Sequence, residues 1–288
     1  MSAPALIEIF CDGNKKIGMG HIRRSSALAE KLKEAKIDVI ISGLSEEAKK
    51  LLPAQPSYNR KPDVVLFDSL EGIDNELQKA QSNKQLTITL DWFGDTIPDI
   101  NIVVFPHSEV RAKKEKYIGF EYIILREEIL RAERPVVTDN NKVLICLGGA
   151  DLLKQSYDAA VLLKEQGFDI TLVQGPLAKN IPDDGIRKLV DPSDFPSLLA
   201  NCDWAVTNGA GCFFEAMYLG KAAFVLPQTG LEMRIAVFAQ KENAVLGIGM
   251  DQLRGFSYAE IKETSAKGAA LVNGGGLDRV TAIIKNLL

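Results

Sequence analysis

A histidine follows two closely spaced glycines in the segment 12–24, directly after the first apolar run of the chain. Gly18 and Gly20 allow the backbone to turn sharply or to approach a ligand closely. His21 then stands at the start of a predicted helix, where the positive end of the helix dipole disfavours an imidazolium ion. We therefore predict a neutral, base-competent ring at His21, which makes it the best candidate catalytic residue. The alternative is a tight turn in which His21 only caps the helix.

The same glycines raise the possibility of a dinucleotide site, which requires the pattern Gly-x-Gly-x-x-Gly. If Gly18 is the first glycine, Arg23 stands in place of the third. A bulky residue at that position prevents close packing of helix and strand. The sequence therefore disfavours a nicotinamide-dependent redox enzyme.

A second small-residue segment, 208–215, lies between an apolar run and a predicted helix. A flexible loop that opens a helix presents free backbone amides to an anion, which suits the diphosphate of a nucleotide. Segment 147–151 ends another predicted strand and could line the same site. The alternative in both places is a tight turn. The residues predicted to bind nucleotide or phosphate are Gly148, Gly149, Asn208, Gly209, Ala210, Gly211, Cys212, Glu215 and Glu232.

Carboxylates follow several predicted strands. Asp68, Asp91 and Asp95 could position sugar hydroxyls or act in acid–base chemistry, or they could be ordinary turn residues. Glu232 opens a predicted helix and could accept hydrogen bonds from ribose, or it could be a solvated carboxylate that the helix dipole favours. The lysines at 113, 114 and 116 are interpreted as a solvated face.

Short apolar runs alternate with stretches of helical length throughout the chain, which predicts parallel sheets covered on both faces. The pattern restarts after a polar segment, 135–141, which we interpret as a linker. The fold class is therefore α/β with two Rossmann-like lobes, 1–134 and 142–288, and a ligand cleft between them. The last helix could pack back on the first lobe. The strands are predicted at 6–11, 39–41, 64–67, 86–90, 102–105, 143–147, 170–173, 204–207 and 223–226, and the longer helices at 22–36, 156–166, 194–201, 212–219, 232–242, 258–272 and 277–288.

The composition excludes several classes of function. A net charge of −4 and a pI of about 5.4 disfavour nucleic-acid binding. The four cysteines form no C-x-x-C pair and are interpreted as reduced thiols, and the two histidines form no metal-binding pattern. No apolar stretch reaches the roughly 20 residues of a membrane helix, and the chain start does not resemble a signal peptide. We expect a cytoplasmic protein without a metal, and the oligomeric state is left open.

The chain resembles the UDP-sugar hydrolases of the pseudaminic-acid pathway, which are similar to two-lobed glycosyltransferases of the GT-B type. The resemblance rests on Gly18-x-Gly20-His21-x-x-Arg24 and on segments 64–68, 122–128, 147–151 and 209–216. Their order and spacing cover most of the chain. Two positions depart from the family pattern: Leu70 replaces a tyrosine that follows the aspartate matching Asp68, and Met233 replaces the asparagine of a Glu-Asn-Gln motif.

The resemblance implies metal-independent hydrolysis of a nucleotide-linked, UDP-type acetamido-deoxy sugar in nonulosonic-acid or surface-glycan biosynthesis. His21 would activate the attacking water with Asp68 as a second catalytic residue, and the 209–213 amides would stabilise the departing diphosphate. No cofactor is implied. The residues expected to contact the sugar are Asp12, Gly18, Gly20 and Arg24. Two alternatives stay open: a glycosyltransferase on the same scaffold, in which His21 deprotonates an acceptor hydroxyl, and a non-catalytic nucleotide-sugar binder.

Overall fold

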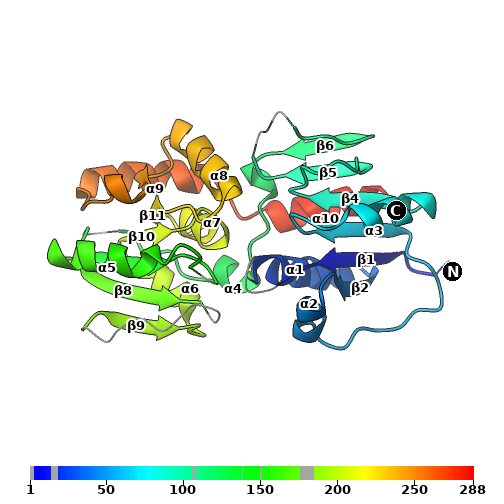
Figure 1. Cartoon of the computed structure of the whole chain (residues 1–288), viewed down its shortest axis with the longest axis horizontal. Coiled ribbons are helices and arrows are strands. Elements are labelled where there is room, and N and C mark those ends of the chain that lie inside the picture. Colours follow the sequence, from blue (N-terminus) through cyan, green and yellow to red (C-terminus); the bar gives the residue numbers. More distant parts are fainter. Residues whose placement is uncertain are drawn as a thin grey trace. The chain divides into compact units, whose positions relative to one another are not determined.

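The computed structural model of the chain describes residues 3–13, 19–105, 107, 109–137, 139–149, 151–175 and 185–288. Contacts between Cα atoms divide the chain into two compact units (Figure 1). The first contains Met1–Arg126 and Gly274–Leu288, and the second is Glu127–Asn273. The segment 127–134, which we predicted in the first lobe, belongs to the second unit. The C-terminal helix, which we expected could pack back on the first lobe, belongs to the first unit.

The first unit is built on a parallel six-stranded sheet of order β2-β1-β3-β4-β5-β6. Its strands are β1 (Leu6–Cys11), β2 (Asp38–Gly43), β3 (Val64–Asp68), β4 (Leu86–Leu90), β5 (Ile100–Val103) and β6 (Glu115–Ile118). Its helices are α1 (Gly20–Glu34), α2 (Glu46–Leu51), α3 (Asp74–Ser82), α10 (Gly276–Asn286) and the 3-10 turn η1 (Phe120–Tyr122).

Strand β3 shows why this sheet needs helices on both faces, since all five of its residues are buried. Val64 and Leu66 join the core on the side of α1 and α10, and Val65 and Phe67 join a second cluster on the side of α3. A strand that is apolar on both faces is typical of a doubly covered parallel sheet.

The C-terminal helix α10 is part of the first unit in space, although it comes last in the chain. Val280 and Ile284 enter the same core cluster as the apolar face of α1. Lys31 on α1 pairs with Asp278 at 3.0 Å, and Arg279 donates to the carbonyl of Glu121 at 2.9 Å. These contacts hold the end of the chain against the first sheet.

The second unit contains another parallel six-stranded sheet, of order β12-β11-β10-β7-β8-β9. Its strands are β7 (Lys142–Cys146), β8 (Asp169–Gln174), β9 (Arg187–Val190), β10 (Trp204–Thr207), β11 (Ala222–Val225) and β12 (Gly247–Ile248). Its helices are α4 (Glu127–Leu130), α5 (Gln155–Glu165), α6 (Phe195–Ala200), α7 (Gly211–Tyr218), α8 (Gly230–Lys241), α9 (Tyr258–Leu271) and the 3-10 turn η2 (Met250–Gln252). Trp204 is fully buried and packs edge-on against Phe256, with ring centroids 5.4 Å apart.

Both sheets reverse their strand order at one point, and ligands of open parallel sheets bind beside such a point, at the carboxyl ends of the strands. In the first sheet the reversal lies between β1 and β3, and in the second it lies between β7 and β10. The segments that follow these four strands, together with the first turns of α1 and α7, contain most of the residues that the sequence singles out. Within the described residues, no helix is long and apolar enough to cross a membrane.

Candidate functional site

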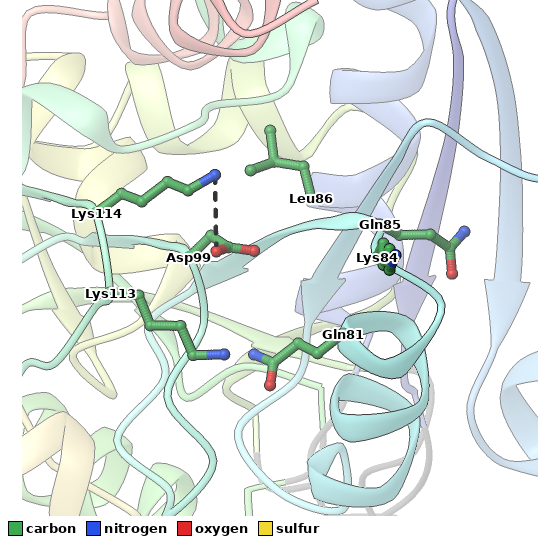
Figure 2. A pocket seen from close by; sticks show the side chains of 7 residues that line it. All are labelled: Gln81, Lys84, Gln85, Leu86, Asp99, Lys113 and Lys114. Carbon is green, nitrogen blue, oxygen red and sulfur yellow. Dashed lines mark ion pairs between the residues drawn. The ribbon is translucent and has the colours of Figure 1, made fainter.

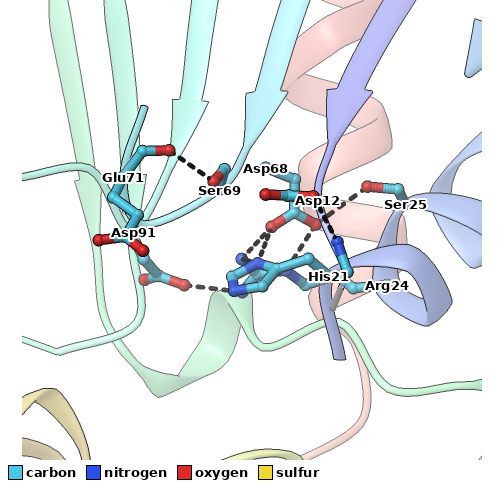
Figure 3. A network of polar contacts seen from close by, with 9 residues as sticks. Asp12, His21, Arg24, Ser25, Asp68, Ser69, Glu71 and Asp91 are labelled. Carbon is cyan, nitrogen blue, oxygen red and sulfur yellow. Dashed lines mark hydrogen bonds and ion pairs between the residues drawn. The ribbon is translucent and has the colours of Figure 1, made fainter. Parts of the chain in front are cut away.

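Asp68 is the centre of a buried polar network at the carboxyl end of β3 (Figure 3). Its carboxylate is fully buried and accepts hydrogen bonds from three residues of α1. Oδ1 lies 2.6 Å from Nδ1 of His21 and 2.5 Å from Nη2 of Arg24. Oδ2 accepts from Nε of Arg24 at 2.9 Å and from Oγ of Ser25 at 3.1 Å. The first turns of α1 and the end of β3 therefore form one constellation.

Arg24 joins this network to a second carboxylate. Its Nη1 donates to Oδ2 of Asp91 at 2.7 Å, and Asp91 directly follows β4. Asp91 has a left-handed backbone with φ of 54°, and its Oδ1 accepts from the backbone N–H of Val104 at 2.9 Å. The left-handed turn and this hydrogen bond aim the Asp91 carboxylate at Arg24.

The electrostatics of the network keep Asp68 ionised. Burial alone would raise the pKa of Asp68, but the charge of Arg24 and the hydrogen bonds from His21 and Arg24 hold that pKa well below its usual range. Burial would likewise lower the pKa of Arg24, but Asp68 and Asp91 hold it above its ordinary value. Arg24 is therefore a fixed cation between two carboxylates.

His21 is oriented for proton transfer by this carboxylate. An ionised Asp68 only accepts hydrogen bonds, so in the neutral ring Nδ1 carries the proton and Nε2 has a lone pair. The His21 side chain is 13% exposed, and Nε2 makes no hydrogen bond to the described part of the chain. A water or an alcohol at Nε2 could give up its proton there, while Asp68 stabilises the resulting imidazolium.

The other first-unit residues have structural contacts. Asp12 Oδ1 accepts from Ser45 Oγ at 2.5 Å and from Gly13 N at 2.8 Å, and Ser45 caps α2. Gly20 begins α1, and a Cβ atom there would meet open space. Gly18 lies outside the described residues. Sugar contacts by Asp12, Gly18, Gly20 and Arg24 stay a prediction.

In the second unit, the loops after β7 and β10 approach each other closely. Gly148 and Gly209 both have left-handed backbones, with φ of 80° and 91°. A Cβ atom on Gly148 would lie 3.0 Å from Nδ2 of Asn208, so only glycine fits easily there. Gly149 comes next in the same loop, and the adjoining Ala150 lies outside the described residues. The small residues thus allow two loops to meet at the carboxyl edge of the sheet.

Glu232 ties these loops to the loop after β11. Its Oε1 accepts from Asn208 Nδ2 at 2.6 Å, and its Oε2 accepts from the backbone N–H groups of Gln228 and Thr229 at 2.7 and 3.0 Å. Thr229 caps α8 by accepting from Glu232 N at 3.3 Å. Burial raises the pKa of Glu232 to about 7, against the lowering effect of these hydrogen bonds. Both carboxylate oxygens thus have protein donors, and a ribose contact by Glu232 stays a prediction.

Helix α7 begins at Gly211, directly after the Asn208–Ala210 turn. Its N-cap residue, Ala210, makes no side-chain hydrogen bond to the first turn in the described structure. Backbone N–H groups at a helix start can donate to an anion. Cys212 lies in this first turn with its Sγ 3.4 Å from Sγ of Cys146, and Glu215 is buried one turn later. The arrangement suits an anion, and a phosphate site here stays a prediction.

Sequence reasoning named Asp91 among several carboxylates but missed Ser25. Ser25 is four residues after His21, so helical spacing alone places it on nearly the same face of α1. No such signal distinguishes Asp91 from Asp95, whose side chain is fully exposed beside Arg111. The Asp91 carboxylate, unlike that of Asp95, is directed toward Arg24 because of the left-handed turn at Asp91.

A small polar pocket of about 250 Å³ lies elsewhere on the first unit (Figure 2). Its lining includes Lys113 and Lys114, and Lys114 lies 3.8 Å from Asp99, which also accepts from Thr87. These residues lie at the amino ends of β4, β5 and β6, whereas Asp68 and Asp91 lie at the carboxyl ends of β3 and β4. The pocket is therefore separate from the His21 network. Among the described residues, no cluster of three or more His, Cys, Asp or Glu side chains could hold a metal ion.

Two curated proteins are similar to this chain in sequence. An uncharacterized protein of Methanocaldococcus jannaschii, MJ1062, is 26% identical over 78% of this chain, which spans 56% of that protein. The spore coat polysaccharide biosynthesis protein SpsG of Bacillus subtilis is 24% identical over 98% of both chains. No protein-family model matches the chain.

Solved structures of glycosyltransferases share the fold. MurG of Acinetobacter baumannii superposes with a TM-score of 0.66 at 13% identity, covering 98% of this chain and all of MurG. The Streptomyces sp. SF2575 glycosyltransferase SsfS6, complexed with thymidine diphosphate, gives a TM-score of 0.64 at 12% identity, covering 98% and 99%. Together with the two parallel six-stranded sheets, these matches identify the GT-B-like α/β fold. The expected relation to the pseudaminic-acid hydrolases is supported only as far as this fold.

Proposed function

We propose that this chain is a glycosyltransferase that moves a sugar from a nucleotide donor to an acceptor hydroxyl. The observation that carries the proposal is the contact between Asp68 and Nδ1 of His21, which leaves Nε2 available as a general base. The fold supports a transferase more than the hydrolase expected from the sequence, because the structural neighbours include several glycosyltransferases.

In the proposed reaction, the acceptor O–H donates its proton to Nε2 of His21. The acceptor oxygen forms a bond to the anomeric carbon of the donor as the bond from that carbon to the phosphate oxygen breaks. The electron pair of the broken bond leaves with the nucleoside diphosphate. Asp68 stabilises the imidazolium that forms, and Arg24 and Ser25 hold Asp68 in position. General base catalysis of this kind contributes about 10²–10⁴-fold in rate.

The second unit supplies our proposed diphosphate site. The amides of Gly211 and Cys212 open α7, and Gly148 and Gly209 allow close approach of the backbone. Such donors would stabilise the negative charge that develops on the leaving group. The thymidine diphosphate complex of SsfS6 supports a nucleoside diphosphate as the class of ligand. A cleft between the two units that holds the donor stays a prediction.

The chain offers a matched pair of variants, since His21 and His107 are its only histidines. Purified protein is incubated with UDP-, dTDP-, GDP- and CMP-sugars and a panel of sugar acceptors, and products are followed by mass spectrometry. We expect His21→Ala to lower turnover by about 10²–10⁴-fold while thermal stabilisation by the nucleotide is kept. His107→Ala should keep turnover within a few-fold of wild type. Equal turnover in wild type and His21→Ala would refute the assignment of the base.

Hydrolysis is the second candidate, favoured by the resemblance of Gly18-x-Gly20-His21-x-x-Arg24 to the sugar hydrolases. Water would then replace the acceptor hydroxyl at Nε2. Free sugar formed at the same rate with and without acceptor would support hydrolysis, and product that requires an acceptor would support transfer. Nucleotide binding without turnover of any donor would refute both and leave the non-catalytic binder.

A further inference from the structure

Two cysteines lie against each other at the proposed diphosphate site. Cys146 is the last residue of β7, and Cys212 is in the first turn of α7, yet their Sγ atoms are 3.4 Å apart. Cys146 is 5% exposed, and Cys212 is half-buried, so a small oxidant can reach the pair from the side of Cys212. The other two cysteines differ, because Cys202 donates to the Leu199 carbonyl at 3.1 Å and Cys11 is fully buried on β1 in the first unit.

We propose that Cys146 and Cys212 form an oxidisable thiol pair, a disulfide modification site at the start of α7. The formation of the bond is independent of the proposed function, whereas its effect on ligand binding rests on that function. The sequence predicts four reduced thiols and gives no sign of the pair, because 66 positions separate the two residues. Only the fold brings them together.

The backbone around the pair allows the bond to form by a small local movement. A disulfide requires about 2.05 Å between sulfurs, so the two Sγ atoms must approach by roughly 1.4 Å. Cys146 is fixed on an inner strand, where it lies in register with Thr207 of β10. Cys212 follows a turn with a left-handed glycine, Gly209, and the N-cap Ala210 makes no described side-chain hydrogen bond to α7. We therefore expect the first turn of α7 to move.

The reaction needs an external oxidant, and a peroxide or a small disulfide such as oxidised glutathione supplies it. With hydrogen peroxide, the Cys212 thiolate attacks one oxygen, the O–O bond breaks, and a sulfenic acid and water result. Sγ of Cys146 then attacks the sulfenic sulfur, the S–O bond breaks, and a second water leaves. Two thiols are oxidised by two electrons, and one peroxide is reduced to two waters.

The Cys146–Cys212 disulfide would displace the backbone N–H groups that we propose to bind the diphosphate. The N–H groups of Gly211 and Cys212 belong to the turn that must shift, and displacing hydrogen-bond donors aimed at an anion weakens its binding. We expect oxidation to raise the Kd for UDP by about tenfold or more, which corresponds to roughly 1.4 kcal/mol. Reduction should restore binding.

The direct test is peptide mapping of the full chain by mass spectrometry without reductant, after treatment with hydrogen peroxide or oxidised glutathione. We expect a peptide that links Cys146 to Cys212 and a loss of two of the four free thiols in wild type. Cys212→Ser and Cys146→Ser should form no such link. Cys202→Ser and Cys11→Ser are matched controls, which should form it as wild type does.

The outcomes separate the modification site from the proposed function. Absence of the Cys146–Cys212 link in folded wild type, or loss of two of the three remaining thiols in Cys212→Ser under the same treatment, would overturn the proposal. A link with unchanged UDP affinity would support the site and overturn its effect on binding. If the reduced protein binds none of UDP, dTDP, GDP or CMP, the diphosphate site of the proposed function fails, and peptide mapping still decides whether the disulfide forms.

Discussion

Replacing Asp68 by asparagine removes the charge that orients His21 while nearly keeping the shape of the side chain. The carboxylate accepts from His21, Arg24 and Ser25, all within 3.1 Å. An amide NH₂ group cannot accept from Nδ1, so the His21 ring would turn or change tautomer and Nε2 would lose its lone pair. Loss of the orienting carboxylate of an Asp–His pair costs about 10⁴-fold in kcat where it has been measured in proteases. We expect Asp68→Asn to lower kcat by about 10³–10⁴-fold with little change in KM.

The assay compares steady-state kinetics of Asp68→Asn with those of Asp99→Asn. Asp99 is a matched control, because it accepts hydrogen bonds from Thr87 at the opposite end of the same sheet. Asp99→Asn should change stability without changing kcat by more than a few-fold. Circular dichroism and urea unfolding verify that both variants fold. A folded Asp68→Asn protein with the kcat of wild type would refute the role of the Asp68–His21 contact.

The unfolding free energies of wild type and Asp68→Asn should also depend differently on pH. The folded-state pKa of Asp68 lies below the unfolded value of about 3.9, so its stabilising effect is present above that pH and is lost as the pH falls through the folded-state pKa. Breaking a buried ion pair costs about 3–5 kcal/mol. The difference in unfolding free energy between wild type and Asp68→Asn should therefore be largest near neutral pH and should shrink in acid. A difference that stays constant with pH would contradict the lowered pKa.

Three further predictions concern single contacts. Asp91→Asn should lower kcat by about tenfold, because Arg24 loses one of its two carboxylates but keeps Asp68, and steady-state kinetics against Asp95→Asn measure this. Because the folded-state pKa of Glu232 is raised to about 7, wild type should lose stability as the pH rises through that value. Urea unfolding at about pH 5 and pH 8 should show wild type losing up to about 3 kcal/mol of unfolding free energy relative to Glu232→Gln. No such loss would contradict the raised pKa. Gly209→Ala should cost about 1–3 kcal/mol of unfolding free energy, because φ is 91° and the new Cβ would lie 3.1 Å from the Glu232 carbonyl oxygen. Gly211→Ala is the control, because a Cβ atom at that position would have no neighbour within contact distance.

The fold class could be predicted because buried parallel strands are apolar on both faces. Strand β1 has the predicted bounds, Leu6–Cys11, and its six residues are buried or nearly so. Strands β6 and β9 were missed, because both lie at sheet edges and keep polar residues such as Glu115 and Arg187. Helix α3 was also missed. The membership of α10 in the first unit depends on contacts between distant segments, which local periodicity does not specify.

The candidate site could be predicted in part, because the strands that position it are recognisable from their apolar residues. His21 and Asp68 each end up at the carboxyl side of neighbouring strands, which parallel topology dictates once the strands are recognised. The contact between them could not be predicted, because it depends on the direction of α1 across the sheet. The fixed position of Arg24 likewise requires Asp91, and the turn that aims Asp91 has a backbone conformation that its sequence does not reveal.

The net charge of the buried network bears on the proposed role of His21. Asp68 and Asp91 contribute two negative charges and Arg24 contributes one positive charge, so the buried cluster is one positive charge short while His21 is neutral. In the proposed reaction, a proton that arrives on Nε2 of His21 supplies that charge. In the proposed reaction, Asp68 faces the positive charge that develops on the His21 ring, and only an interaction that is stronger in the transition state than in the ground state raises kcat. If Arg24 were absent, the two carboxylates would repel each other, and if Asp91 were absent, Arg24 would neutralise Asp68 and weaken its effect on the imidazolium. The proposed role of His21 as a base therefore depends on both carboxylates around one guanidinium.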